Sequence, residues 1–193
     1  EIADAIAAGA TLSTHLGNGC ASVLPRHPNV IWEQLASDAL HASLIVDGHH
    51  LPASTVRALV RAKGAERTIL VTDATAAAGS APGRYSIGAV EGELGADGRV
   101  SLPGTPFLAG SSLTLDRAVA NTVRFTGLAI AAVIPMASTI PARLIGTTPA
   151  GTVSAEWDPE RFELQIIGVR PGSDRGQTGV RPAGADSDEE REI

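Results

Sequence analysis

Two polar side chains at the ends of short strand-like runs have the chemistry needed for metal-assisted hydrolysis. His15 ends a run that begins at Thr11, and Asp73 ends a run that begins at Thr68. A neutral imidazole can donate a lone pair to Zn²⁺ or a similar ion, and a nearby carboxylate can take a proton from an attacking water. Each residue also has a structural interpretation, because His15 suits a hydrogen-bonded core histidine and Asp73 suits a helix N-cap.

Other polar candidates form short loop motifs. The five histidines lie between positions 15 and 50, and His49 and His50 directly follow Asp47 and Gly48, in what could also be an ordinary polar turn. No Gly-x-Ser-x-Gly elbow surrounds a serine, so a serine nucleophile has weak support. No Walker or dinucleotide-type glycine pattern is present either, and nucleotide cofactors are not indicated.

These side chains require a scaffold that brings strand ends together. Residues 2–9 predict a short helix, 11–15 a strand, 42–47 a second strand and 52–63 a helix. Residues 68–73 are apolar without alternation, as expected of a strand buried on both faces of a parallel sheet. Repeated strand–loop–helix units predict an α/β fold, either a doubly wound sheet or a (β/α)₈ barrel, with its chemistry at the carboxyl ends of the strands.

The second half of the sequence changes character. Glycine-punctuated alternation over about 84–104, with Asp97 and Gly98 at its centre, predicts an inserted β-hairpin. Helical spacing returns over about 111–126 and 128–138, and short strands are expected between 152 and 167. Residues 170–193 carry almost no apolar side chains and predict a disordered acidic tail.

Composition excludes several classes of partner. The net charge is −6, but the last eight residues hold five acids and one arginine, so the body is close to neutral. With aromatic residues at 3%, neither a nucleic-acid partner nor base stacking is indicated. The longest apolar stretches are too short for a membrane span. A single cysteine, Cys20, and no leader at Glu1 predict a cytoplasmic protein, and we expect the chain to be a fragment.

Six short motifs follow one another along the chain. They are Thr14-His15-Leu16-x-Asn18, Arg26-x-Pro28, Asp47-Gly48-x-His50, Leu70 to Ala74, Leu108 to Thr114, and Met136-Ala137 with Pro141 to Arg143. In this order they resemble the N-acetylglucosamine-6-phosphate deacetylase family of the amidohydrolase superfamily. The resemblance covers roughly residues 1–153, and several motifs in the right order match by chance far less often than one.

The resemblance implies the C-terminal half of a metal-dependent (β/α)₈ barrel. Residues 1–150 would hold strands six to eight and the inserted hairpin, 151–169 a short β segment of a small β-sandwich, and 170–193 the disordered tail. The implied reaction is hydrolysis of the acetamide of N-acetylglucosamine 6-phosphate to glucosamine 6-phosphate and acetate.

By the same resemblance, His15 would bind one divalent ion, zinc with iron or manganese as alternatives, and Asp73 would be the catalytic acid and base. Arg26 and His50 would bind the phosphate of the amino sugar, and Arg26 would reach the site of a neighbouring subunit, which implies a homodimer. The other residues that would line the substrate site are Asn18, Gly19, Asp47, Gly48, His49, Leu108, Ala109 and Gly110.

The sequence also departs from the family pattern. The loop Gly17 to Cys20 replaces an aromatic-Asn-Ala-Met run, and residues 151–169 lack the usual Gly-Lys-x-Ala-Asp-Leu ending. The family's metal site also uses a glutamate and a histidine from earlier strands, so we expect the isolated chain to be inactive and poorly stable, with exposed strand edges. Two alternatives stay open: a related amidohydrolase acting on another N-acyl sugar or a cyclic amide, and a non-catalytic subunit remnant.

Overall fold

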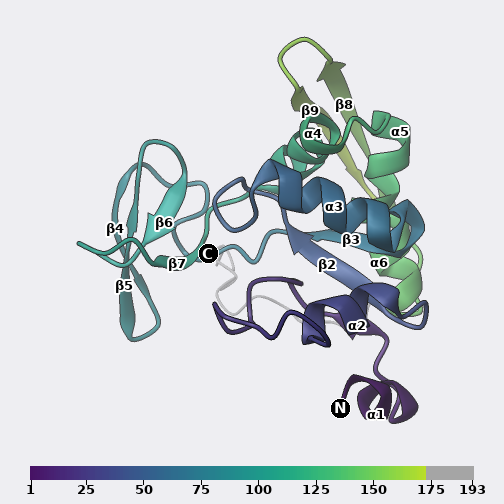
Figure 1. Ribbon diagram of the computed structural model, residues 1–193. Coiled ribbons are helices and arrows are strands. Elements are labelled where there is room, and N and C mark those ends of the chain that lie inside the picture. The colour runs from purple at the N-terminus through teal and green to yellow at the C-terminus, as the bar shows by residue number, and fades with distance from the viewer. Residues whose placement is uncertain (173–193) are drawn as a thin grey trace, which may run out of the picture.

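A three-stranded parallel sheet lies at the centre of the computed structural model, which describes residues 1–172 (Figure 1). Its strands are β1 (Leu12–Ser13), β2 (His41–Ile45) and β3 (Thr68–Val71), in the order β1-β2-β3. The predicted α/β class is therefore confirmed. Each strand ends about two residues earlier than predicted, so the polar residues that close the three runs lie in loops. Because neighbouring strands are parallel, these loops share one edge of the sheet.

Helices precede and connect these strands. α1 (Ile2–Ala7) precedes β1, α2 (Val30–Ala36) precedes β2, and α3 (Ala53–Lys63) with the short 3₁₀ helix η1 (Ala65–Arg67) joins β2 to β3. α3 was predicted, and its buried Val56, Leu59 and Val60 belong to the main core. α2 was not predicted, although Asn29 accepts hydrogen bonds from the N–H groups of Ile31 and Trp32 as a typical N-cap.

The second half of the fold adds four helical segments. They are α4 (Leu115–Thr126), α5 (Ile130–Val133), the 3₁₀ helix η2 (Ile134–Ala137) and α6 (Thr139–Leu144). The helix predicted from 111 begins only at Leu115, because Ser111 still pairs in a strand. The helix predicted over 128–138 changes from α to 3₁₀ next to Pro135, which lacks the N–H that an α-helix needs. α4, α5 and η2 contribute Val119, Val133 and Met136 to the main core.

The segment between β3 and α4 is a separate four-stranded antiparallel sheet, drawn away from the α/β body in Figure 1. It contains β4 (Gly83–Ile87), β5 (Val90–Leu94), β6 (Arg99–Ser101) and β7 (Leu108–Ser111). The predicted single hairpin over 84–104 is wrong in extent. Asp97 and Gly98 do form a turn, but it joins β5 to β6, while β4 and β5 form a hairpin of their own.

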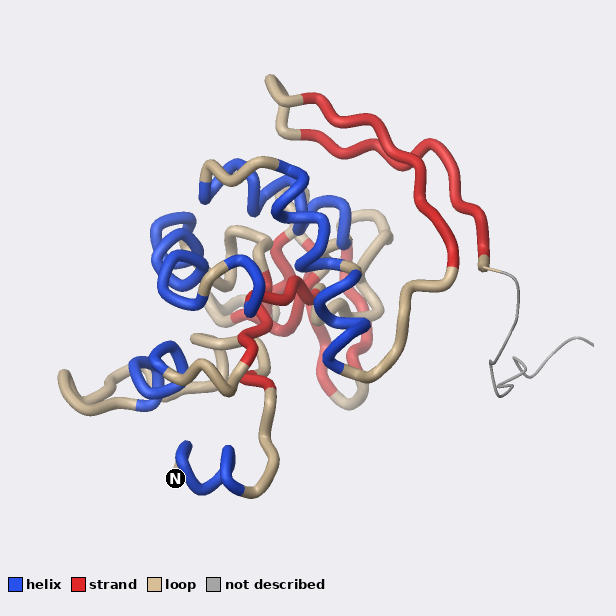
Figure 2. The backbone as a smooth tube through the Cα atoms, turned by 90° about the vertical axis from the view of Figure 1, so that its right-hand side faces the viewer, coloured by secondary structure: helices blue, strands red, loops and turns tan. Residues whose placement is uncertain are grey.

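A two-stranded antiparallel ribbon follows α6 and extends from the body in Figure 2. Its strands are β8 (Gly151–Asp158) and β9 (Glu163–Pro171), with Trp157 and Phe162 packed edge to face near the connecting loop. β9 runs past the boundary that we predicted at 170, and the rest of the expected tail, 173–193, lies outside the described residues. The division into barrel, sandwich and tail stays a prediction. Within residues 1–172, no helix is long and apolar enough to span a bilayer.

Candidate active site

Three loops meet at the carboxyl edge of the parallel sheet, and each contains residues that the sequence singled out. His15 to Gly19 follow β1, Asp47 to His50 follow β2, and Asp73 follows β3. His15 has φ 31° and Asp73 has φ 48°, values that non-glycine residues adopt only rarely. Such conformations persist where the surrounding structure holds them, and they concentrate at functional sites.

His15 is held through its backbone. Its N–H donates to the Ser43 hydroxyl oxygen at 2.8 Å, and the next N–H, of Leu16, donates to the Ser43 carbonyl at 2.9 Å. Leu16 is buried in the main core and anchors the loop. The two bonds attach the chain that follows β1 to β2, and they fix the position of the His15 imidazole.

The His15 ring has a buried nitrogen without a partner. Within residues 1–172, Nδ1 makes no hydrogen bond, which does not fit the interpretation of His15 as a hydrogen-bonded core histidine. Gly19 packs against the ring, since a Cβ at Gly19 would lie 3.3 Å from Cε1 of His15. A desolvated nitrogen normally has a partner, so this imidazole fits the role of a metal ligand.

A complete metal site is not formed by this part of the chain. Among residues 1–172, no three side chains of His, Cys, Asp or Glu are grouped closely enough to hold an ion. His15 alone therefore does not complete a metal site among these residues.

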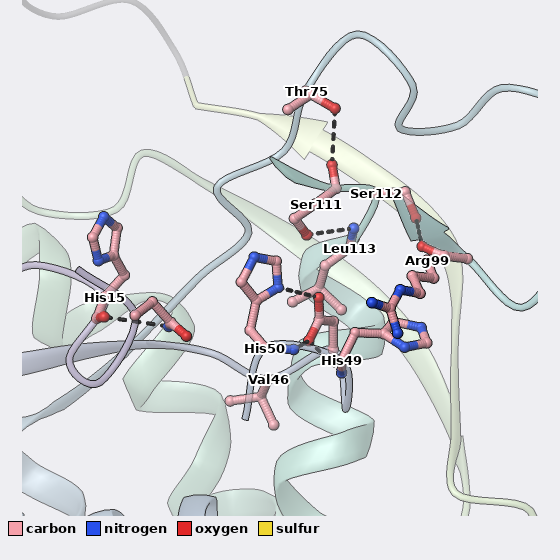
Figure 3. A network of polar contacts seen from close by, with 12 residues as sticks. His15, Val46, His49, His50, Thr75, Arg99, Ser111, Ser112 and Leu113 are labelled. Atoms are coloured by element: carbon pink, nitrogen blue, oxygen red, sulfur yellow. Dashed lines mark hydrogen bonds and ion pairs between the residues drawn. The ribbon is translucent and has the colours of Figure 1, made fainter. Parts of the chain in front are cut away.

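The loop after β2, with His49 and His50 labelled in Figure 3, is organised by Asp47. Its Oδ1 accepts the N–H groups of His49 and His50, both at 2.8 Å, and its Oδ2 lies 2.6 Å from Nδ1 of His50. Burial raises the pKa of the Asp47 carboxyl, but the hydrogen bonds from His50 and His49 outweigh burial, so its pKa lies below the ordinary value. The His49 ring contacts the Asp97 carbonyl instead, with Nε2 3.3 Å from the oxygen.

Asp73 lies exposed in an irregular loop, and no helix begins there, so its interpretation as a helix N-cap is wrong. Its loop is attached to β7. Ala74 forms a parallel bridge with Ser111, and both N–H and Oγ1 of Thr75 donate to the Ser111 carbonyl, at 2.9 and 3.2 Å. Gly110 has φ 116°, and a Cβ there would overlap Cγ2 of Thr75.

Leu108 to Gly110 form most of β7 in the inserted sheet and do not lie in a loop. Their place in the substrate site stays a prediction. Their connection with the site runs through the contact of Gly110 and Ser111 with the Asp73 loop.

Asn18 and Arg26 differ in how they relate to this edge. Asn18 belongs to the His15 loop, and its N–H and Nδ2 both donate to the His15 carbonyl, at 3.0 and 3.3 Å. Arg26 lies exposed between β1 and α2, and within the described residues its guanidinium makes no hydrogen bond or ion pair. The structure therefore brings together the His15, Asp47 and Asp73 loops but joins Arg26 to none of them.

Two small cavities adjoin these loops. One of about 230 Å³ lies beside Gly17 and Gly19 and is bordered by Ile31 and Gln34 of α2. Another of about 140 Å³ has Asp47 and Arg117 among its lining residues. Both are small for a sugar phosphate, since ligand pockets usually measure about 300 Å³ or more.

Three positioning residues were missed in the sequence. Ser43, Thr75 and Ser111 hold the loops of His15 and Asp73, and Ser43 and Ser111 are buried. Ser43 carried a signal, because it is the one polar residue within the apolar run 42–46. Thr75 and Ser111 are 36 positions apart, and nothing local connects them.

Comparison with known proteins gives consistent relatives. No protein-family model matches the chain. It is 39% identical over 140 residues to N-acetylgalactosamine-6-phosphate deacetylase of Escherichia coli O157:H7, covering 72% of this chain and 36% of that protein. It is also 39% identical over 133 residues to a protein of Escherichia coli strain K12 that carries the same name provisionally, covering 68% of this chain and 77% of that one.

The fold resembles that of a solved enzyme as well. A mutant of N-acetyl-D-glucosamine-6-phosphate deacetylase from Mycobacterium smegmatis, in complex with N-acetyl-D-glucosamine 6-phosphate, superposes with a TM-score of 0.76 at 28% identity. The match covers 86% of this chain and 45% of that one. The chain thus spans less than half the length of this enzyme and of the first relative.

Proposed function

Since this chain belongs to the family of N-acetylglucosamine-6-phosphate and N-acetylgalactosamine-6-phosphate deacetylases, we propose that it supplies part of an active site for metal-dependent hydrolysis of the acetamide of N-acetylglucosamine 6-phosphate. The products are glucosamine 6-phosphate and acetate. The observation that carries the proposal is the occurrence of His15 and Asp73, both at positive φ, at the carboxyl ends of parallel strands in one sheet.

The proposed fold is a closed (β/α)₈ barrel of which β1, β2 and β3 form strands six to eight. Their parallel order and the helices between them support this arrangement. In such a barrel the active site lies at the carboxyl ends of the strands, where the three loops meet.

His15 would hold one divalent ion, zinc or alternatively iron or manganese, together with ligands from outside this chain. The bound ion would polarise the acetamide carbonyl. The buried, unpaired Nδ1 of His15 supports its role as a ligand, because a ring placed without a partner is ready to donate a lone pair.

Asp73 would move the proton in both halves of the reaction. Its carboxylate accepts a proton from water as the water oxygen attacks the carbonyl carbon, and it returns that proton to the nitrogen as the C–N bond breaks. One acid–base group suffices, because the second step returns what the first removed. Exposure of Asp73 beyond the strand end leaves the carboxylate accessible for this role.

Asn18, Gly19 and the Asp47–His50 loop would line the substrate site, with β7 at its border. Arg26 and His50 would bind the 6-phosphate, which a planar guanidinium suits well. Arg26 is exposed and unpaired within residues 1–172, and we place it in the site of a second subunit of a homodimer. A phosphorylated sugar as substrate fits a cytoplasmic location.

N-acetylgalactosamine 6-phosphate is a second candidate substrate. The two relatives at 39% identity are both named for it. The two sugars differ in the configuration at one hydroxyl, so the same hydrolytic groups would serve either.

The decisive experiment measures acetate release from both sugar phosphates by the protein expressed from its complete natural reading frame, with and without Zn²⁺. We expect metal-dependent turnover that falls about 10²- to 10⁴-fold in Asp73→Asn. Asp38→Asn is the control, because Asp38 is an exposed carboxylate beside the amino end of β2, at the opposite edge of the sheet. Folding of each variant is checked by circular dichroism.

Each other result has a distinct meaning. Equal loss in both variants would contradict a catalytic role for Asp73. Turnover of unphosphorylated N-acyl sugars or cyclic amides, unaffected by Arg26→Ala, would favour a related amidohydrolase. Absence of turnover in folded, metal-loaded protein would favour a non-catalytic subunit.

A further inference from the structure

The loop after β2 contains a carboxylate–imidazole pair. Oδ2 of Asp47 lies 2.6 Å from Nδ1 of His50, and the two side chains are only 9% and 11% exposed. A contact this short between partly desolvated groups requires a proton between them, since two lone pairs would repel. Because a carboxylate at neutral pH only accepts, the proton is on Nδ1.

A second aspartate shows which part of this arrangement is local turn geometry. Oδ1 of Asp158, the last residue of β8, accepts the N–H groups two and three residues later, at 2.9 and 3.0 Å. Asp47 makes the same two bonds through its own Oδ1. An asparagine oxygen could accept these bonds equally well. The turn therefore does not explain why position 47 carries a carboxylate.

The need for a carboxylate at position 47 comes from His50. With Oδ1 occupied by two N–H groups, the second atom of the side chain faces Nδ1 of His50. An oxygen there accepts Nδ1–H, whereas the NH₂ group of an asparagine would have to donate, and Nδ1 would then have to be unprotonated. The identity of residue 47 thus selects the tautomer of His50.

We propose that Asp47 is a positioning residue that keeps Nδ1 of His50 protonated and turns the ring so that Nε2 alone is presented to the 6-phosphate of the substrate. This inference rests on the proposed function for the identity of the ligand, but not for the tautomer. In Figure 3 one nitrogen of the His50 ring makes the dashed contact, and the other ring nitrogen points away from that contact.

The pair explains how an imidazole can bind a phosphate ester. Phosphate oxygens accept hydrogen bonds, so Nε2 must carry a proton in the complex, and the ring is then positively charged. The Asp47 carboxylate offsets this charge at 2.6 Å, and the bond from Nε2 to the phosphate is charge-assisted. A neutral partner at position 47 would leave at most a neutral donor.

The first test measures the tautomer directly by long-range ¹H–¹⁵N correlation spectra of the histidine rings, with His50→Gln used to assign the signal. In the free wild-type protein we expect His50 to be protonated on Nδ1, either alone or together with Nε2. In Asp47→Asn we expect the neutral Nε2–H form. A wild-type ring protonated only on Nε2, or an unchanged pattern in the variant, would overturn the proposal.

The second test is kinetic and uses the protein from its complete reading frame. For the 6-phosphate substrate, Asp47→Asn should raise KM about tenfold or more, the loss expected for one charge-assisted bond, with kcat changed about twofold at most. Asp158→Asn is the matched control, because it alters a turn of the same kind in a distant part of the chain. This substitution should leave KM and kcat unchanged. A fall in kcat at constant KM would contradict the positioning role.

The two tests separate the inference from the function on which it rests. The wild-type spectrum is decisive even if Asp47→Asn does not fold, and it requires no turnover. If the expected tautomer is found in a protein without deacetylase activity, the role of Asp47 in positioning His50 is retained and the proposed substrate is rejected.

Discussion

The backbone N–H of His15 donates a 2.8 Å hydrogen bond to the hydroxyl oxygen of Ser43, 28 residues later in the sequence. Ser43 is buried in β2, between the buried Ala42 and Leu44. The bond joins the loop that carries the proposed metal ligand to the neighbouring strand, at a residue whose φ of 31° needs external support.

Ser43→Ala should therefore weaken metal binding more than it weakens the fold. Loss of a group that orients a ligand typically reduces metal affinity 10- to 100-fold, and we expect about this loss for Zn²⁺, measured by competition with a chromophoric chelator. The exposed Ser54 on α3 provides the control, because Ser54→Ala removes a hydroxyl that makes no hydrogen bond within residues 1–172. Equal zinc affinity in wild type and Ser43→Ala would contradict the role of this bond.

Gly110→Ala should disturb the Asp73 loop. The new Cβ would overlap Cγ2 of Thr75, and it would belong to a residue whose φ is 116°, where a side chain causes strain. We therefore expect a loss of about 2 kcal/mol or more in the free energy of unfolding. Turnover should also fall, because Thr75 is two residues from Asp73.

The control for this substitution is Gly79→Ala. Gly79 also has a positive φ, 76°, but a Cβ there meets no atom within 4 Å. We expect it to cost about 1 kcal/mol, for backbone strain alone. Urea denaturation of the three proteins separates the two effects, and equal losses would show that the contact with Thr75 has no influence.

The parallel sheet could be predicted because short strand-like runs bounded by loop residues are a local property, and all three predicted strands are present. α2 was missed even though Asn29 is a good N-cap, because a helix of 7 residues completes less than two turns and shows little helical periodicity, and its Trp32 is exposed. β7 was mistaken for a loop and the start of a helix, since its pairing depends on β6 and on Ala74, which the local sequence does not specify.

The contacts of the candidate site divide in the same way, into local ones and ones between distant segments. The Asp47 turn is local, because its partners lie two and three residues later, and its polar character could be predicted. The pairing of His50 with Asp47 could have been found from the same spacing. The bonds from Ser43 to His15 and from Thr75 to Ser111 connect distant segments, and only the folded chain shows them.

Asp47 should also make stability depend on pH. Its pKa in the folded protein lies below the ordinary value of 3.8, so the folded state binds the proton less readily than the unfolded chain. The resulting stabilisation is fully present above the unfolded pKa, about 3.9, and is lost as the pH falls through the folded pKa. Asp47→Asn has no such group. The difference in unfolding free energy between wild type and variant should be constant from pH 7 to about pH 5 and decrease below about pH 4. A difference that grows as the solution is acidified would reverse the assigned sign.

Lys63, the only lysine of the sequence, is 4% exposed and closes the C-terminal end of α2. Its Nζ donates to the carbonyl oxygens of Gln34 and Ser37, at 2.8 and 2.6 Å. Burial lowers the pKa of Lys63, with a smaller contribution in the same direction from Arg67 and an opposing one from Asp38. Lys63→Met keeps the apolar part of the side chain but leaves both carbonyls without this donor. We expect it to lower the free energy of unfolding by about 1–3 kcal/mol.

Arg61→Met is the matched control, because Arg61 lies exposed on the same helix, two residues earlier. This substitution should change stability by at most about 0.5 kcal/mol. Since Lys63 joins α3 to α2, its loss should release α2 first, and hydrogen exchange of the α2 amides should accelerate more than that of the β2 amides. If both variants unfold at the same urea concentration as the wild type, the two carbonyl bonds contribute nothing to the attachment of α2.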